Sequence, residues 1–315
     1  MMITKFTRKD FDNVLKEYSI GKYKSHKYIF TGGNTVFKLE TSQGKFILKI
    51  FEHATLKFIK TQNNLSDFLE ERDVAIAKIV HASSGESILI YKKKKIVIQE
   101  FIEGEEMETI NSKIAKDMGE KLGILNKLLL KYPHKDINWS GKIHFEVMKY
   151  GRFRKTPDMN FKKESLKVIK ECNKLKRNKL RKCVIHGDIA ESNFLIKNNK
   201  LKAVIDWDDY QYNYLAFDIA VFVGHILTER EKVRIDLIKI FFKEYQKQLK
   251  LNKEEIKAIY FFAKKRLLDG AIWSINLAVK HPKKKREVLG WARVCWKKYL
   301  HLDNLTLNEF IQLSK

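Results

Sequence analysis

The stretch that decides the fold is Cys183–Asp209, CVIHGDIAESNFLIKNNKLKAVIDWDD. A short apolar run leads into a His-Gly-Asp triplet that ends at Asp188, and a second apolar run follows Asn193. The polar turn 198–200 joins this second run to a third, which ends at Asp206. Two apolar runs joined by a short polar turn predict a β-hairpin, which brings the residues at its open end side by side. We therefore expect Asp188, Asn193 and Asp206 to converge.

These three side chains have the chemistry that phosphoryl transfer from magnesium-ATP requires. One carboxylate orients a hydroxyl and accepts its proton, while an amide and a second carboxylate offer hard oxygen ligands to Mg²⁺. We accordingly predict Asp188 as the catalytic base and Asn193 and Asp206 as the metal ligands. Asp208, two residues beyond Asp206, is a further candidate for a substrate or second-metal contact.

The order of strand, His-Gly-Asp, Asn193, strand and Ile205-Asp-Trp-Asp208 resembles the signature of aminoglycoside phosphotransferases, choline kinases and homoserine kinases. The resemblance implies a two-lobed, protein-kinase-like α+β fold with ATP and Mg²⁺ as cofactors. Residues 1–102 are then a nucleotide-binding lobe with a small antiparallel sheet. Residues 103–315 are a larger, mainly helical lobe that carries catalysis and the acceptor. The resemblance also implies that His186 and Asp218 position the catalytic loop.

Composition excludes several other classes of protein. The chain has 315 residues, 44% of them hydrophobic, which is enough for a sizeable core. It has no apolar run long enough to span a membrane and no recognisable secretory leader. Its 3 cysteines lack metal-ligand spacing, which favours reduced thiols in a cytoplasmic protein.

The chain is strongly basic, with 63 Lys and Arg against 38 Asp and Glu and a net charge of +25. Such a charge could mark a nucleic-acid or acidic-membrane partner, or simply a solvated lysine-rich surface. Lysine is spread along the whole chain and no nucleic-acid-binding motif is present, so the solvated surface is favoured and nucleic acid is not expected as a partner. A field this positive attracts nucleotides and anionic or zwitterionic metabolites.

The N-terminal part predicts a helix over 3–18 and strands over 27–30, 35–39 and 45–51. The turn between the first two strands contains Gly33 and Asn34. A glycine turn allows backbone N–H groups to approach a phosphate, and this one is similar to the short glycine–asparagine turn of homoserine kinases. An ordinary hairpin turn is the alternative.

Lys49 lies in the third of these strands and shares a face with Ile47 and Phe51, where it is partly shielded. A half-buried lysine usually has an anionic partner. The resemblance implies that this partner is the phosphates of ATP; the alternative is an edge-strand lysine that reaches solvent. In the helix expected over 54–72, Gln62 stands where the family pattern has a glutamate, which leaves the protein partner of Lys49 open.

Two more strands are expected over 87–91 and 96–102, with Lys92–Lys95 as a solvated turn between them. The resemblance implies that main-chain groups near Gln99 to Phe101 bind the adenine edge of ATP. A hinge between the lobes is expected at 103–106.

The C-terminal part predicts helices over 112–130, 164–182, 229–250, 252–280, 283–300 and 303–314. On the fourth of these, Arg266, Asp269 and Trp273 recur at intervals of three and four and therefore share one face. We interpret this face as the candidate acceptor wall. The alternative is an Arg–Asp surface pair beside a core tryptophan. Residues 139–160 are less regular and hold Trp139, Arg152 and Arg154. A second, weaker candidate for the acceptor wall consists of Trp291, Arg293 and Trp296.

The predicted activity is transfer of the γ-phosphoryl group of ATP to a hydroxyl of a small metabolite. Homoserine or a related amino alcohol is the first choice of acceptor, because the Gly33–Asn34 turn and the strand around Lys49 resemble that branch. Choline, ethanolamine or an aminoglycoside is the alternative acceptor. An alternative from another functional class is a catalytically inactive relative that serves as a structural or nucleotide-binding protein. The sequence specifies neither the acceptor nor the oligomeric state.

Overall fold

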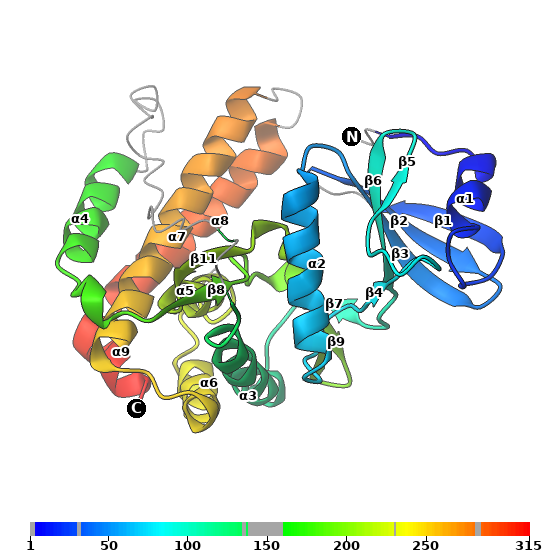
Figure 1. Cartoon of the computed structure of the whole chain (residues 1–315). Helices are drawn as coiled ribbons and strands as arrows, with labels where there is room; N and C mark the ends of the chain where they lie inside the picture. The colour runs from blue at the N-terminus through cyan, green and yellow to red at the C-terminus, as the bar shows by residue number, and fades with distance from the viewer. Residues whose placement is uncertain (1–3, 30–32, 134–136, 138–159, 230, 281–284) are drawn as a thin grey trace. The chain divides into compact units, whose positions relative to one another are not determined.

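The computed structural model describes residues 4–29, 33–133, 137, 160–229, 231–280 and 285–315 (Figure 1). The chain divides into two compact units. The first comprises residues 1–105 with 202–205, and the second comprises 106–201 with 206–315. Residues 138–159, which include Trp139, Arg152 and Arg154, lie outside the described residues.

The first unit is an antiparallel sheet with two helices. Its strands follow the order β1-β2-β3-β6-β4, and β5 pairs with β6. The elements are β1 (Tyr23–Ile29), β2 (Thr35–Thr41), β3 (Gly44–Phe51), β4 (Ile79–Val80), β5 (Leu89–Tyr91), β6 (Lys94–Glu100), α1 (Arg8–Leu15) and α2 (Leu56–Glu70). The small antiparallel sheet expected near the N-terminus is therefore present, and the α+β prediction is confirmed.

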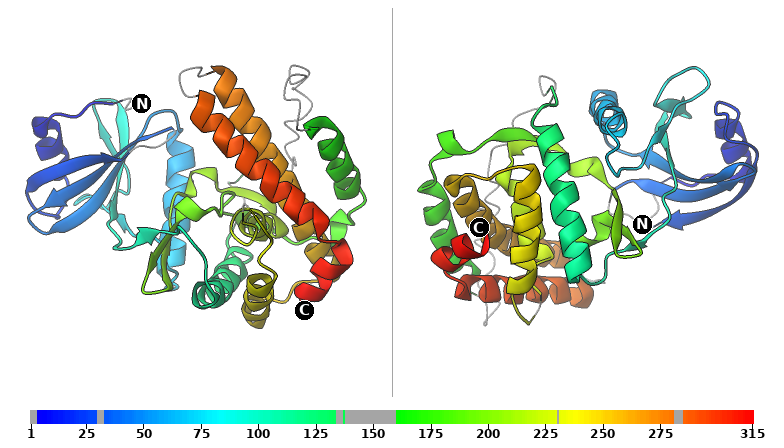
Figure 2. Two further views of the ribbon diagram at one scale, coloured as in Figure 1. Left: turned by 180° about the vertical axis from the view of Figure 1, so that it is seen from behind. Right: turned by 90° about the horizontal axis from the view of Figure 1, so that it is seen from below.

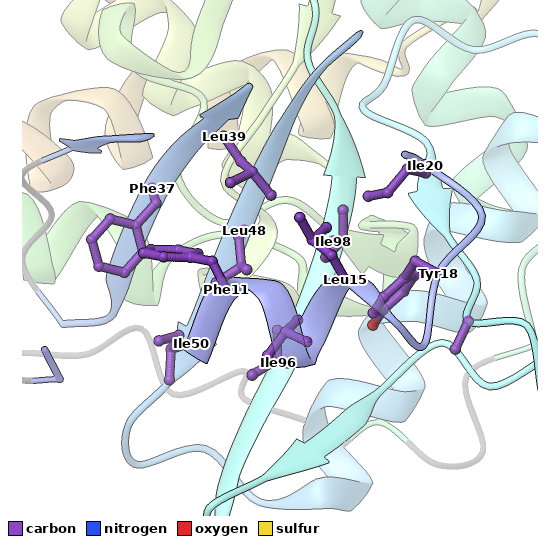
Figure 3. Packing of buried hydrophobic residues seen from close by; sticks show 12 residues of the cluster. Phe11, Leu15, Tyr18, Ile20, Phe37, Leu39, Leu48, Ile50, Ile96 and Ile98 are labelled. Carbon is purple, nitrogen blue, oxygen red and sulfur yellow. The ribbon is translucent and has the colours of Figure 1, made fainter. Parts of the chain in front are cut away.

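Helix α1 closes one face of this sheet. Thr7 and Asp10 form a capping box at its start, each side chain bonding to the other's backbone N–H. Phe11 and Leu15 of α1 then pack against a layer that includes Leu48 and Ile50 of β3, all of them almost fully buried (Figure 3). Because side chains alternate along a strand, the residues of β3 between and beyond these two face away from α1.

The opposite face of β3 carries Lys49. Its neighbour on that face, Phe51, packs with Ile59 of α2 and Val97 of β6. Lys49 itself is partly buried, and its Nζ lies 5.0 Å from the centre of the Phe51 ring. Lys49 is therefore partly shielded, as strand alternation predicts.

The solvated turn predicted at Lys92–Lys95 is confirmed for Lys92 and Lys93, which are exposed, but not for Lys94 and Lys95, which are partly buried. The turn consists of Lys92 and Lys93 alone, both with positive φ, and β6 begins at Lys94. The Nζ of Lys92 lies 2.6 Å from Asp10 Oδ1, that of Lys94 lies 2.7 Å from Glu52 Oε2, and that of Lys95 donates to a backbone carbonyl. The charges are close in sequence, but carboxylates brought near by the sheet fold compensate them.

The second unit is mainly helical. It contains α3 (Ser112–Leu129), α4 (Phe161–Asn173), α5 (Ala216–His225), α6 (Ile235–Gln248), α7 (Lys253–Lys280), α8 (Lys285–Asn304) and α9 (Leu307–Leu313). Strand β8 (Lys182–Ile185) pairs with β11 (Gln211–Tyr214) in an antiparallel ribbon. Strands β9 (Phe194–Lys197) and β10 (Lys200–Val204) form the predicted hairpin, and β7 (Glu105–Glu106) adds to β9.

The helix predicted over 164–182 ends earlier than expected. Helix α4 stops at Asn173, a single 3-10 turn covers Arg177–Lys179, and Lys182 already belongs to β8. Pairing of β8 with a strand far along the chain overrides the local helical pattern.

Helices α4, α5, α8 and α9 pack against the long helix α7. Helices α7 and α8 run side by side for most of their lengths, and α5 packs against α7 (Figure 2). The start of α7 is fixed by Asn252, whose Oδ1 accepts from the N–H of Glu255, as the capping pattern predicts. Glu255 is fully buried and receives a bidentate pair from Arg181, whose Nε and Nη2 each lie 2.7 Å from one of its oxygens. Among the described helices, none has the length and apolar character to cross a membrane.

Candidate active site

The His-Gly-Asp triplet forms a sharp turn at the end of β8. Gly187 has φ +86°, a conformation that side-chain-bearing residues rarely adopt. A Cβ on Gly187 would lie only 2.2 Å from the backbone oxygen of Asp209. The turn therefore lies directly against the segment that follows β10, and glycine is the residue that this approach allows.

A buried carboxylate holds the turn from behind. Asp218, near the start of α5, accepts from the backbone N–H of His186 at 2.8 Å and from that of Gly187 at 2.9 Å. Burial raises the pKa of Asp218, while the nearby His186 and these two hydrogen bonds oppose the rise. The His186 ring is itself fully buried and packs on the ring of Trp207, with 4.6 Å between centres. Both residues thus lie where they can position the loop, as the resemblance implies.

The turn presents Asp188 to Asn193, the asparagine of the motif. The Nδ2 of Asn193 donates to the backbone oxygen of Asp188 at 2.8 Å and to its Oδ2 at 3.1 Å. Asn193 ends a short 3-10 turn and is buried. The amide therefore fixes both the backbone and the side chain of Asp188.

Asp206 follows β10 on an unusual backbone. Its φ and ψ are 60° and 66°, in the left-handed region, and it precedes the 3-10 turn Trp207–Asp209. Asp206 is exposed, Asp208 is partly exposed and Trp207 is buried against His186. The left-handed residue reverses the chain, so that the aspartates after β10 return to the His-Gly-Asp turn.

Asp209 is a member of this group that sequence reasoning missed. The residue as a whole is exposed, yet desolvation of its carboxyl raises its pKa, and the negative charges of Asp188, Asp206 and Asp208 add to the rise while Arg266 opposes it. The charges of three other aspartates therefore act on the carboxyl of Asp209. The available signal was that the motif ends in two consecutive aspartates rather than one.

Helix α3 clasps the turn of the hairpin. Asp117 Oδ2 accepts from the N–H of Leu201 at 2.7 Å, and Lys121 donates to the oxygen of the same residue at 2.6 Å. Asn111, the N-cap of α3, donates to the side chain of Asn199 at 2.8 Å. The turn joining the two strands is thus anchored by side chains of one helix.

Arg266 of α7 forms an ion pair with Asp188. Its Nη2 lies 2.6 Å from Asp188 Oδ1, and the two side chains are 30% and 28% exposed. The sequence placed Arg266 on the candidate acceptor wall, and the structure brings it to the predicted base itself. Within the described residues, the Nε of Arg266 is buried without a hydrogen-bond partner.

The other two residues of that helix face are Asp269 and Trp273. Asp269 forms an ion pair with Lys265, and Trp273 is 55% exposed. The core tryptophan of the alternative interpretation is not found, because Trp273 is largely exposed.

A second cation reaches the catalytic loop from α8. Lys298 Nζ lies 3.0 Å from Glu191 Oε1, in the 3-10 turn that ends at Asn193, and it also donates to the backbone oxygen of His225. Burial lowers the pKa of His225 well below its ordinary value, and the charges of Arg266 and Lys298 lower it further. Nothing in the sequence pattern pointed to Lys298, because its partners lie far away along the chain.

The candidate nucleotide-binding residues of the first unit lie in the turn between β1 and β2 and in or just after β6. Gly33 has open space where a Cβ would lie. Asn34 Oδ1 accepts from the backbone N–H of Glu52 at 3.2 Å, so its side chain ties the turn to the end of β3. Gln99 is in β6, opposite Ile47. The N–H of Phe101 donates to the oxygen of Lys45 at 3.3 Å, and Lys38 Nζ covers its ring at 4.0 Å.

The fold, a small antiparallel sheet and a helical unit with the His-Gly-Asp loop, is that of the small-molecule kinases. The chain belongs to the phosphotransferase enzyme family, whose model matches residues 31–249. The predicted class, an ATP-dependent phosphotransferase acting on a small metabolite, is confirmed at this level.

The relatives and the similar solved structures are named for several different acceptors. A homoserine kinase of Bartonella henselae is 27% identical over 262 residues, covering 81% of this chain and 82% of that protein. A solved microcompartment-associated aminopropanol kinase has a TM-score of 0.74 at 17% identity, covering 96% of this chain and 100% of that one. An amicoumacin kinase solved with AMP-PNP, Ca²⁺ and Ami has a TM-score of 0.73 at 16% identity, covering 96% of this chain and 97% of that one. At these identities the two structures establish the fold alone.

Proposed function

We propose that the chain transfers the γ-phosphoryl group of ATP to the hydroxyl of a small amino alcohol, with homoserine as the first acceptor. The carrying observation is the arrangement of Asp188, which Asn193 holds at one carboxylate oxygen while Arg266 contacts the other. The homoserine kinases among the relatives support the choice of acceptor.

In the proposed step, Asp188 accepts the proton of the acceptor hydroxyl. The hydroxyl oxygen forms a bond to the γ-phosphorus of ATP, and the bond from that phosphorus to the β–γ bridging oxygen breaks. The products are a phosphate ester and ADP. The contribution of Asn193 is to keep the carboxylate of Asp188 in one orientation, which a general base requires.

Asn193 and Asp206 are proposed to hold Mg²⁺. Their donor set fits this ion: Asp206 is an exposed carboxylate, and the Nδ2 of Asn193 is engaged by Asp188, so that its amide oxygen, which has one long hydrogen bond of 3.5 Å from Ser192, is the atom offered to the metal. Mg²⁺ in kinases takes one or two protein ligands and fills its other positions with phosphates and water. When bound, the ion neutralises charge on the phosphates of ATP. Asp208 is proposed to support this site.

Lys49 is proposed to contact the phosphates of ATP, with Gly33, Asn34 and the main chain near Gln99 and Phe101 as the remaining nucleotide contacts. In this proposal residues 1–102 bind nucleotide and residues 103–315 carry catalysis and the acceptor. Support comes from the position of Lys49, partly buried on the face of β3 that does not pack on α1.

A cytoplasmic location is part of the proposal. Cys172, Cys183 and Cys295 are buried free thiols. Burial raises the pKa of Cys172 and of Cys295 to about 12, so both stay protonated and unreactive. This suits a reducing compartment.

The test is ADP formation with purified protein, ATP and Mg²⁺ over a panel of homoserine, 3-aminopropan-1-ol, choline, ethanolamine and an aminoglycoside. We expect acceptor-dependent ADP release that is largest with homoserine. If no acceptor on the panel raises ADP release above the rate measured without acceptor, the kinase proposal is overturned. Release with choline or an aminoglycoside in preference to homoserine would replace the acceptor and leave the reaction type standing.

A further inference from the structure

The ion pair between Arg266 and Asp188 uses only part of the arginine. The Nε–H and one Nη2–H of a guanidinium point the same way and together bind both oxygens of a carboxylate. At Arg266 the Nη2 donates to Asp188 Oδ1, whereas the Nε is buried and, among the described residues, has no acceptor. The pair is therefore one-pronged.

The chain contains a complete pair for comparison. Arg181 binds Glu255 with its Nε and Nη2 at 2.7 Å each, one nitrogen to each carboxylate oxygen. Asp188 does not offer Arg266 the same fit: its Oδ2 accepts from Asn193, and its backbone oxygen is bound by the same amide. The amide of Asn193 orients the carboxylate of Asp188, and the Nε–H of Arg266 has no acceptor among the described residues.

Arg266 lies among charges of both signs, because it acts on Asp209 together with Asp188, Asp206 and Asp208. Lys298, which is paired with Glu191, is a second cation in this region, and both cations add to the burial that lowers the pKa of His225. Asp269, one turn further along α7, is engaged by Lys265. Arg266 also lies outside residues 31–249, so its contact with Asp188 is not part of the pattern that the family model describes.

We propose that Arg266 binds the carboxylate of the acceptor, and that its contact with Asp188 masks the catalytic base until such an acceptor arrives. This rests on the proposed function. An acceptor carboxylate engages Nε and Nη2 together, which Asp188 does not, and so displaces Asp188 Oδ1 from the arginine. Asp188 Oδ1 can then accept a hydrogen bond from the acceptor hydroxyl. Acceptor choice and base release are thereby linked through one side chain.

Acceptors that differ in the carboxylate alone test the first half of the proposal. 3-Aminopropan-1-ol is homoserine with hydrogen in place of the carboxylate, and homoserinamide has a neutral amide there. Wild-type protein is expected to favour homoserine over both in kcat/KM. Arg266→Met is expected to reduce kcat/KM for homoserine roughly 10- to 100-fold, mainly through KM, and to leave that for 3-aminopropan-1-ol unchanged or higher. Arg266→Lys should recover part of the loss.

Lys257→Met is the matched control, because it removes a positive charge from the same helix at a residue paired with Glu254. It should leave both acceptors unaffected. An equal loss of kcat for all acceptors in Arg266→Met would overturn the proposal, because it would assign Arg266 to the transferring phosphoryl group. Wild-type protein that phosphorylates 3-aminopropan-1-ol as efficiently as homoserine would also overturn it, while leaving the kinase function intact.

Binding without turnover tests the second half. Calorimetric titration with homoserine in the absence of nucleotide should show tighter binding to Asp188→Asn than to wild type, because the neutral amide competes less for Arg266. Arg266→Met should bind homoserine at least about tenfold more weakly than wild type, with an unchanged melting temperature as the check on folding. Weaker or unchanged binding to Asp188→Asn would overturn the mask. If no acceptor on the panel is phosphorylated at all, the proposed function fails, and this inference fails with it.

Discussion

The alpha carbon of Gly187 faces the backbone oxygen of Asp209 so closely that a Cβ at this position would lie 2.2 Å from that oxygen. The two residues belong to the two loops that carry the predicted base and the predicted metal ligand. Their contact fixes the distance between these loops without any side chain.

Gly187→Ala is therefore expected to destabilise the protein and reduce its activity. Positive φ alone costs an alanine about 1 kcal/mol, and the clash adds about 1–3 kcal/mol more. Gly85→Ala is the matched control, because Gly85 has φ +85° with open space around the missing Cβ. Melting temperatures of the two variants separate the contributions; equal losses would mean that the approach to Asp209 is not tight.

Asp188→Asn is expected to lower kcat for the preferred acceptor by about 10²- to 10⁴-fold, because an amide cannot accept the hydroxyl proton. Nucleotide affinity should stay close to that of wild type. Acceptor-dependent ADP release and equilibrium binding of a non-hydrolysable ATP analogue measure the two quantities. Undiminished turnover would remove Asp188 from the role of base.

Lys49→Met is expected to raise the KM for ATP roughly 10- to 100-fold through loss of a charged contact to phosphate. Lys45→Met is the control: it changes an exposed lysine on the same strand and, by strand alternation, on the same face. If the two variants have the same KM for ATP, Lys49 is an ordinary surface lysine.

Acid stability should depend on Asp10. Hydrogen bonding to Lys92, then to the N–H of Thr7, lowers the pKa of Asp10 below its ordinary value of 3.8. A depressed folded-state pKa means that the ionised carboxylate stabilises the fold above about pH 4, and that this stabilisation is lost as the pH falls below that value. Between about pH 5 and about pH 3, the melting temperature of wild type should therefore fall more than that of Asp10→Asn.

Asp12→Asn, at a side chain on the same helix that is 46% exposed, is the control and should follow wild type. At neutral pH, Asp10→Asn should be less stable than wild type by about 1–3 kcal/mol, because the buried partner of Lys92 and Tyr91 loses its charge. Parallel melting curves for wild type and Asp10→Asn across the acid range would contradict the assignment.

Local spacing made the catalytic loop predictable from the sequence. The turn at Asn198–Asn199, both with positive φ, and the apolar runs beside it define the β9–β10 hairpin by themselves. Capping at Thr7 and at Asn252 likewise depends on residues three positions apart. The hairpin and these caps match the structure because their determinants are neighbours in the chain.

Contacts between distant segments were not predictable in the same way. Helical periodicity placed Arg266 on a face of α7, but its partner Asp188 is 78 residues away. The ion pairs of Lys92 with Asp10 and of Lys94 with Glu52 were likewise not predicted, because these carboxylates lie far away along the chain. A single sequence gives the face of a helix or strand and not the segment opposite it, so ion pairs across the fold were found only in the structure.

The clasp between α3 and the hairpin turn bears on how this enzyme can be engineered. Asn198–Lys200 has the composition of a permissive surface loop, the usual choice for a tag or a fluorescent insert. Its neighbour Leu201 is nevertheless held at both its N–H and its oxygen by Asp117 and Lys121. An insert there would pull on the strand that leads directly to Asp206, so labels are better attached elsewhere.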